Sequence, residues 1–209
     1  MTVKLLVIGE RTPRDAIIEQ VARKVSGSTT THIRRCRSPE LLVDIVRSVR
    51  HSHGPIDSLD LYDHGTRGAI VMGAAALFGS DSDPTTPLTG AAIAAELAPL
   101  LSELAHLRLL GCDTAILEFN DPEGGRMMLL KLARLLGPRR SVFGTIVGIG
   151  AGCFDRDGFN DERVVELLCS AYTAIDFTLP TYNQRQLALN DYWLAAPSHP
   201  QPPSSERQA

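Results

Sequence analysis

The sequence predicts an α/β fold, a three-layer sandwich in which helices cover both faces of a mostly parallel sheet. Short apolar runs of strand length alternate with segments whose apolar residues recur at helical spacing. Alternating strands and helices imply right-handed crossovers, which make neighbouring strands parallel. Hydrophobic residues form 44% of the 209 residues, which is enough apolar surface for one large domain with a substantial core.

Three strands and two helices are expected in the first half of the chain. The strands are residues 3–9, 30–37 and 58–65. The second of them is partly polar, which indicates a position near an edge of the sheet. Thr12 and Pro13 have the pattern of a helix N-cap followed by a proline in the first turn, and Ser38 and Pro39 repeat it. The apolar helix faces are Ile17, Val21 and Val25, then Leu42, Ile45 and Val49.

The second half opens with a glycine-bounded apolar hairpin, and a polar loop follows it at residues 81–87. A helix capped by Thr89 is expected to run toward residue 104, with Pro99 as a kink or an end. The hairpin covers residues 68–79. The later elements are a strand at 106–115, a helix capped by Asn120–Pro122 and stopped by Gly137, a strand at 141–150 and a helix from Asp161 to Tyr172.

One folded domain is expected over residues 1–178, followed by an extension over residues 179–194 that packs on it. The last fifteen residues, 195–209, contain four prolines and three serines, and this composition predicts a disordered tail.

Charge and composition narrow the function classes. Lys and Arg number 21 against 24 Asp and Glu, so the net charge is −3 and no nucleic-acid partner is expected. No apolar stretch is long enough to span a bilayer, and the N-terminal apolar run is too short for the core of a signal peptide, so no membrane contact is expected. The four cysteines, at positions 36, 112, 153 and 169, lack any zinc spacing and indicate free thiols in the cytoplasm. No metal or cofactor is expected.

Two strand ends carry the residues with the most reactive side chains. His64 precedes Gly65 at the end of one apolar run, and Cys112 follows Gly111 at the end of another. The carboxyl ends of parallel strands emerge at one edge of a sheet, where sites collect. A thiol that attacks a carbonyl needs a base such as histidine, and glycines let backbone N–H groups approach the developing oxyanion. The sequence therefore predicts His64 and Cys112 as a catalytic pair. Cys36 and Cys169 are expected to be structural. Whether Cys153, in the loop "GIGAGCF", is an exposed thiol near the site is left open.

The ordered set of motifs resembles the caspase-like (clan CD) cysteine peptidases, most closely their bacterial branch, the CHAT and related caspase-like domains. The motifs are the strand ending in His-Gly, the glycine-rich hairpin, "GCDTA" at 111–115 and "KLARLLGPRRSVFGT" at 131–145. The resemblance covers roughly residues 3–175. It implies a caspase-like fold, His64 as general base, Cys112 as nucleophile and the N–H groups of Gly65 and Cys112 as the oxyanion hole. The histidine of caspases lies about 50 residues before the cysteine, and here the separation, 112 − 64, is 48.

By this resemblance the chain is expected to be a cytoplasmic thiol protease, a hydrolase that cleaves a protein or peptide substrate through an acyl-enzyme. Whether it stays latent until self-cleavage or a regulatory or effector partner activates it is left open. The alternative is an inactive caspase-like fold that serves as a protein-interaction module. Two features depart from the family. Asp63 stands where a small or apolar residue is usual, and as a strand neighbour of His64 it points to the opposite face. The caspase sequence around the cysteine is absent, so a preference for aspartate does not carry over.

Two opposite pockets remain open for the substrate residue that precedes the cleaved bond. Asp113, together with Asp155 or Asp157, would form an acidic pocket that favours Arg or Lys. Arg67 or Arg156 would instead bind an acidic residue through a forked guanidinium. The acidic pocket is the preferred expectation.

Overall fold

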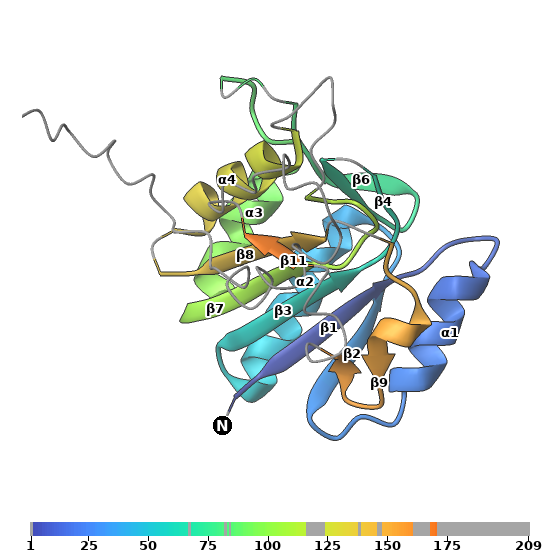
Figure 1. Cartoon of the computed structure of the whole chain (residues 1–209). Helices are drawn as coiled ribbons and strands as arrows, with labels where there is room; N and C mark the ends of the chain where they lie inside the picture. Colours follow the sequence, from blue (N-terminus) through green and yellow to red (C-terminus); the bar gives the residue numbers. More distant parts are fainter. Residues whose placement is uncertain are drawn as a thin grey trace, which may run out of the picture.

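The computed structural model describes residues 2–66, 68–81, 83, 85–115, 124–137, 139–145, 148–160 and 168–170. Within these residues, a central sheet has the strand order β11-β8-β7-β3-β1-β2 (Figure 1). The strands from β2 to β8 in this order are parallel to their neighbours, and β11 runs antiparallel to β8. The strands are β1 (Lys4–Gly9), β2 (Thr31–Cys36), β3 (Ile56–Tyr62), β7 (Leu101–Leu109), β8 (Ser141–Thr145) and β11 (Leu168–Ser170).

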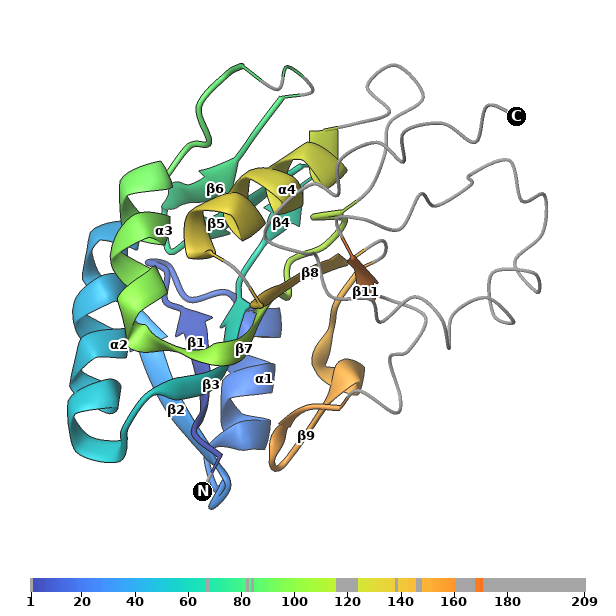
Figure 2. The same cartoon turned by 90° about the vertical axis from the view of Figure 1, so that its left-hand side faces the viewer.

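Helices cover both faces of this sheet, as Figures 1 and 2 show. They are α1 (Ala16–Val25), α2 (Pro39–His53), α3 (Ala91–Leu97) and α4 (Gly124–Leu136). Because successive strand residues point to opposite faces, Leu5 and Val7 of β1 enter the core under α2, α3 and α4. Leu6 and Ile8 enter the core under α1. The predicted α/β fold with a mostly parallel sheet is confirmed, and its layers are compatible with a three-layer sandwich.

A small antiparallel sheet follows β3 and confirms the predicted hairpin. It consists of β4 (Gly65–Thr66), β5 (Ala69–Met72) and β6 (Ala75–Gly79). Ile70, Met72 and Phe78 are buried in the core that α2 covers, which fixes this sheet against the central one. The β5–β6 turn needs glycine at Gly73, because φ is +64° and a Cβ would lie 1.8 Å from the carbonyl oxygen of Arg37.

The first helix begins three residues later than the Thr12–Pro13 pattern predicts. Asp15 is its N-cap, and its carboxylate accepts hydrogen bonds from the backbone N–H groups of Ile17 (2.9 Å) and Ile18 (3.1 Å). These bonds satisfy two of the N–H groups that have no partner inside the helix. The buried face consists of Ile18, Val21, Ala22 and Val25. The predicted face is therefore wrong at Ile17, which is 51% exposed.

The second strand and second helix match their predictions. β2 ends the strand order of the described sheet, as its partly polar sequence indicates. α2 begins at Pro39 with Ser38 as an extended N-cap. Its predicted face is confirmed, since Leu42 and Val49 are buried and Ile45 packs against the same core.

The helix expected between Thr89 and residue 104 is shorter than predicted. It ends at Leu97, a 3-10 turn containing Pro99 follows, and β7 begins at Leu101. Proline cannot donate a backbone hydrogen bond, which ends the helix there. The strand that replaces its last part shows the two-residue period, with Ala105, Leu107 and Leu109 buried.

The last predicted elements are right in part. The glycine stop after α4 is confirmed, because Gly137 has a φ of +89°. β8 stops at Thr145, earlier than the predicted strand at 141–150. Within the predicted helix Asp161–Tyr172, the described residues Leu168–Ser170 form β11 instead. Period alone does not separate a short buried strand from a helix, so the prediction of a helix is wrong there.

Some predictions fall outside the described residues. These are the substrate role of Arg67, the Asn120–Pro122 cap, the extension at 179–194 and the tail at 195–209. The predicted domain of residues 1–178 is described in part. Among the helices of the described ranges, none is both long and apolar enough to cross a bilayer.

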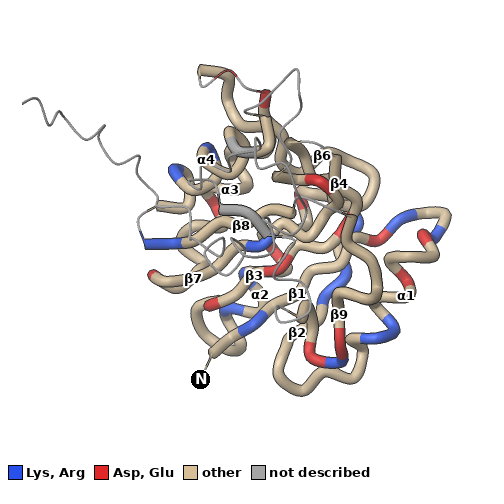
Figure 3. Tube along the Cα trace, in the orientation of Figure 1, with Lys and Arg blue, Asp and Glu red and all other residues tan. Residues whose placement is uncertain are grey.

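Charged residues of both signs lie close together on the surface (Figure 3). Glu19 of α1 pairs with Arg35 of β2 at 2.7 Å, and Asp44 pairs with Arg47 within α2 at 2.5 Å. Exposed pairs of this kind contribute little to stability.

Candidate active site

The ends of β3 and β7 bring His64 and Cys112 to the same edge of the sheet. The two strands are parallel neighbours, with Leu61 opposite Leu109 in the register. Beyond them the two backbones touch. A Cβ on Gly65 would lie 2.5 Å from the carbonyl oxygen and 2.8 Å from the nitrogen of Cys112. Such distances are too short for any other residue, so glycine at this position lets the two strand ends pack against each other.

The same contact excludes a side chain from the other strand end. A Cβ on Gly111 would lie 2.8 Å from Cα of Gly65 and 2.9 Å from its nitrogen. The His-Gly and Gly-Cys pairs therefore act as one close-packed unit at the carboxyl edge. The N–H groups predicted for the oxyanion hole, those of Gly65 and Cys112, belong to this unit.

Two buried threonines hold the turn that carries Cys112. The N–H of Thr145 donates to the hydroxyl of Thr114 (2.8 Å), and this hydroxyl lies 3.1 Å from the carbonyl oxygen of Leu109, within donating distance. The Thr145 hydroxyl donates to the carbonyl of Gly111, and the N–H of Ala115 donates to the Thr145 carbonyl (2.7 Å). These bonds tie residues 111–115 to the end of β8.

Close packing around this turn explains why the "GCDTA" and "FGT" sequences contain small residues. A Cβ on Gly144 would lie 2.9 Å from Cβ of Ala115 and 3.0 Å from the hydroxyl oxygen of Thr114. Asp113, directly after Cys112, has a φ of +58°, a conformation that Asp tolerates better than most residues. The "GCDTA" and "FGT" sequences thus fit each other sterically.

The cysteines whose side chains are described are free thiols with different surroundings. Cys112 and Cys153 are partly exposed, and Cys36 is buried. The sulfur of Cys112 lies 3.8 Å from the place where Gly148 would carry a Cβ. Burial raises the pKa of the Cys36 thiol to about 11, which makes it unreactive at neutral pH. Cys36 is therefore structural as predicted. Cys169 lies in β11, where only the backbone is described.

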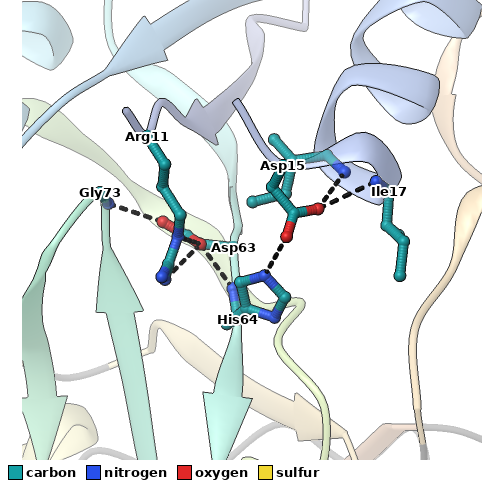
Figure 4. A network of polar contacts seen from close by, with 7 residues as sticks. Arg11, Asp15, Ile17, Asp63, His64 and Gly73 are labelled. Atoms are coloured by element: carbon teal, nitrogen blue, oxygen red, sulfur yellow. Dashed lines mark hydrogen bonds and ion pairs between the residues drawn. The ribbon is translucent and has the colours of Figure 1, made fainter. Parts of the chain in front are cut away.

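The imidazole of His64 has a partner that was not predicted from the sequence. Its Nε2 lies 2.9 Å from Oδ2 of Asp15, the N-cap of α1 (Figure 4). The pKa of Asp15 is lowered, mainly by the Ile18 N–H and next by His64. The hydrogen bonds of the described residues include none between His64 and Cys112.

Asp63, the neighbour of His64, serves the backbone and not the imidazole. Its buried carboxylate accepts hydrogen bonds from the N–H groups of His64 and Gly73, both at 2.6 Å, and from the guanidinium of Arg11 at 3.0 Å (Figure 4). A Cβ on Gly9 would lie 1.9 Å from its Oδ2. Asp63 therefore joins the end of β3 to the hairpin and to the residues after β1.

The structure does not bring the predicted acidic pocket together. Asp113 adjoins Cys112 at the site, but the other two aspartates lie at the turn between β9 (Phe154–Asp155) and β10 (Gly158–Phe159). There Asp155 accepts hydrogen bonds from the Asp157 N–H and from Asn160.

This β9–β10 turn packs at the opposite end of α1 from His64. Asp157 accepts from the hydroxyl of Thr30 (3.1 Å), and Arg156 donates to the carbonyl of Gly27 (2.8 Å). His64 contacts the first turn of the same helix through Asp15. A helix of ten residues is about 15 Å long. The turn, with Arg156 and Asp157, therefore lies at the far end of this helix from the contact between Asp15 and His64.

Asp15 could have been found from the sequence. It is a good N-cap residue directly before an apolar helix face, and it follows β1, whose carboxyl end shares an edge with that of β3. The Thr12–Pro13 pattern matches the same capping rules three residues earlier, so it predicted the wrong N-cap. No group of three or more His, Cys, Asp or Glu side chains among the described residues could hold a metal ion.

Comparison with known proteins adds no relative. No protein-family model matches the chain, and no curated protein and no solved structure matches it.

Proposed function

We propose that the chain is a cysteine endopeptidase of the caspase-like type, with Cys112 as nucleophile and His64 as general base. The observation that carries the proposal is the contact between the backbones of Gly65 and Gly111–Cys112. It joins a base and a thiol on neighbouring strand ends, at the edge of a parallel sheet where α/β proteins form their sites.

The reaction follows from these groups. The Cys112 thiol transfers its proton to His64 and attacks the carbonyl carbon of the peptide bond. The oxyanion that forms accepts hydrogen bonds from the N–H groups of Gly65 and Cys112. His64 then returns the proton to the leaving amine, and the acyl group stays on the sulfur. Water then attacks the thioester carbonyl and gives a proton to His64. The Cys112 thiolate leaves as the acid forms, and His64 returns the proton to the sulfur.

The rigidity of the nucleophile's turn supports the same function. The Thr114–Thr145 hydrogen bonds fix the backbone around Cys112, and Cys112 itself remains partly exposed. A nucleophile needs both accessibility and a fixed position. Cys36 is buried and lacks this accessibility.

A second candidate is an inactive caspase-like fold that acts as a protein-interaction module. It is favoured by one observation, since the His64 imidazole is bonded to Asp15, and no hydrogen bond joins it to Cys112 within the described part of the chain. The same observation fits a peptidase that is latent until self-cleavage or a protein partner moves these loops.

The test compares the wild-type chain with Cys112→Ala and His64→Ala on a complex peptide library, with cut sites read by mass spectrometry. Cys153→Ala is the matched control, because it removes a thiol that is also partly exposed. We expect cuts from the wild type and the control and none from the other two. Equal cutting by Cys112→Ala would exclude this thiol as the nucleophile. If no variant cuts, alkylation of Cys112 no faster than that of Cys153 would favour the inactive module.

The residue that precedes the cuts tests the pocket. Asp113 is the carboxylate of the predicted acidic pocket that adjoins Cys112, so we expect a preference for Arg or Lys there. Asp113→Asn, which keeps a side chain suited to positive φ, should weaken that preference about tenfold. Asp157→Asn should leave it unchanged. An unaltered preference in Asp113→Asn would exclude the acidic pocket. A preference for acidic residues would instead support Arg67.

A further inference from the structure

The His64 imidazole is held by a carboxylate from a distant part of the chain. Asp15 and His64 are separated by 49 positions, and their Nε2–Oδ2 distance is 2.9 Å. This is the distance of a charge-assisted hydrogen bond. The Asp15 side chain is 27% exposed and that of His64 is 43% exposed, so the contact is partly shielded from water.

We infer that Asp15 is the positioning residue of the Cys112–His64 pair, an inference that rests on the proposed function. An ionised carboxylate only accepts hydrogen bonds, so the Nε2 atom that faces it must carry a proton. In the neutral imidazole Nδ1 is then the acceptor. Nδ1 is therefore the atom that takes the thiol proton, and Asp15 stabilises the imidazolium that results.

Asp15 is itself held in place by the helix it caps. Its other oxygen, Oδ1, accepts from the N–H groups of Ile17 and Ile18, at 2.9 and 3.1 Å. One oxygen thus serves the helix and the other serves the imidazole. The partial positive charge of a helix N-terminus also favours the ionised carboxylate. The pKa of Asp15 is lowered accordingly, so it is charged at neutral pH.

Asp63 cannot take this role, because its carboxylate is already occupied. It binds the N–H groups of His64 and Gly73 and the guanidinium of Arg11, on the other side of the strand end. The two aspartates near His64 therefore have different roles. Asp63 fixes the backbone of His64, and Asp15 fixes the ring.

The test measures the reactivity of Cys112 and needs no peptide substrate. Asp15→Ser removes the carboxylate but keeps an N-cap of nearly equal quality. Glu19→Gln is the matched control, because it removes the same charge from the same helix at a residue paired with Arg35. Iodoacetamide alkylation of Cys112 is followed by peptide mass spectrometry from about pH 5 to about pH 9, the range in which histidine and cysteine titrate.

Other titratable groups lie near the pair, so the readout must be specific for one sulfur. Tyr62, whose pKa burial raises far above its usual range, is influenced by Asp15, Asp63, Cys112 and Cys153. Arg11 adjoins Asp63. Mass spectrometry separates Cys112 from Cys153, and circular dichroism checks that each variant melts as a folded protein.

In Asp15→Ser we expect alkylation of Cys112 near neutral pH to fall about tenfold, toward the rate of His64→Ala. Glu19→Gln should react as the wild type does. If Asp15→Ser reacts at the wild-type rate while His64→Ala is slow, the role of Asp15 is refuted and the catalytic pair stands. If His64→Ala also reacts at the wild-type rate, the pair itself fails. Faster alkylation in Asp15→Ser would show that Asp15 keeps His64 from accepting the Cys112 proton, which would equally overturn the inference.

Discussion

The two ends of α1 show how similar residues serve different purposes. At the first turn, Asp15 forms a hydrogen bond with His64, which joins the segments that follow β1 and β3. Gly65 packs against Gly111 and Cys112, which follow β7. Beyond the last turn, Asp155 accepts from a residue two positions on and from Asn160, all within one short turn. Arg156 and Asp157 nevertheless join this turn to Gly27 and Thr30. Distant segments therefore meet at both ends of α1, and the ends differ in the imidazole that Asp15 contacts.

The backbone shows the same difference. Gly65 and Gly111 touch each other across two strand ends, with no space for a Cβ on either. Gly150 and Gly152, which precede the β9–β10 turn, have no atom within 4 Å of an added Cβ. Close packing of backbones is therefore confined, among these four glycines, to the edge that carries His64 and Cys112.

Gly65→Ala should have the largest effect on the molecule. The added methyl group would overlap the Cys112 backbone at 2.5 Å, so the two strand ends must separate. We expect a loss of about 3 kcal/mol in the free energy of unfolding and no detectable peptide cleavage. Urea denaturation and the library assay measure the two effects.

Gly152→Ala is the control for this substitution, because the space around it is open. Its stability should change by less than about 0.5 kcal/mol. If Gly65→Ala were as stable and as active as Gly152→Ala, the close contact of the two strand ends would not matter.

Asp63→Ala should have the next largest effect, on stability. It leaves two backbone N–H groups and Arg11 without their acceptor at a buried position, and we expect a cost of about 2 kcal/mol. Asp155→Ala, at the local turn, should cost less than about 0.5 kcal/mol. Urea midpoints of the two variants measure the difference. Equal midpoints would mean that the contacts around Asp63 contribute no more than those of a surface turn.

The sequence predicted that His64 and Cys112 lie at one edge of the sheet, because a general rule applies to strand ends. Parallel strands expose their carboxyl ends at one edge, so the glycine-flanked His64 and Cys112 could be expected together from the order of the elements alone. No comparable rule predicts where a loop packs after the chain has left the sheet. The β9–β10 hairpin has two-residue strands, too short to show a period, and it carries Asp155 and Asp157 to the other end of α1.

The role of Asp15 could not be predicted from the sequence, for a different reason. Capping rules identify its residue type, but the Thr12–Pro13 pattern matches the same rules three residues earlier. Only the three-dimensional path of the chain after β1 decides between the two. The helix start and the partner of His64 were therefore missed together, since one residue serves both.

The smallest expected effect is a pH dependence of stability at Asp15. Its pKa in the folded chain is below the ordinary value of 3.8, so folding favours the ionised form. The stabilisation is fully present above about pH 4 and is lost as the pH falls through the lower folded pKa. Asp15→Asn keeps the cap but cannot ionise, so it should be less stable than the wild type near neutral pH by about 1 kcal/mol or less.

Below the pKa of the folded carboxyl, the wild type and Asp15→Asn should become equally stable, because both side chains are then neutral. Urea denaturation of the two proteins at a series of pH values measures this convergence. Glu19→Gln is the reference, because it removes a carboxylate of the same helix that pairs with Arg35 and not with His64. A constant difference between wild type and Asp15→Asn at every pH would mean that the charge of Asp15 is irrelevant to the fold. Its contact with His64 would then be a neutral hydrogen bond, and the carboxylate would have no imidazolium to stabilise.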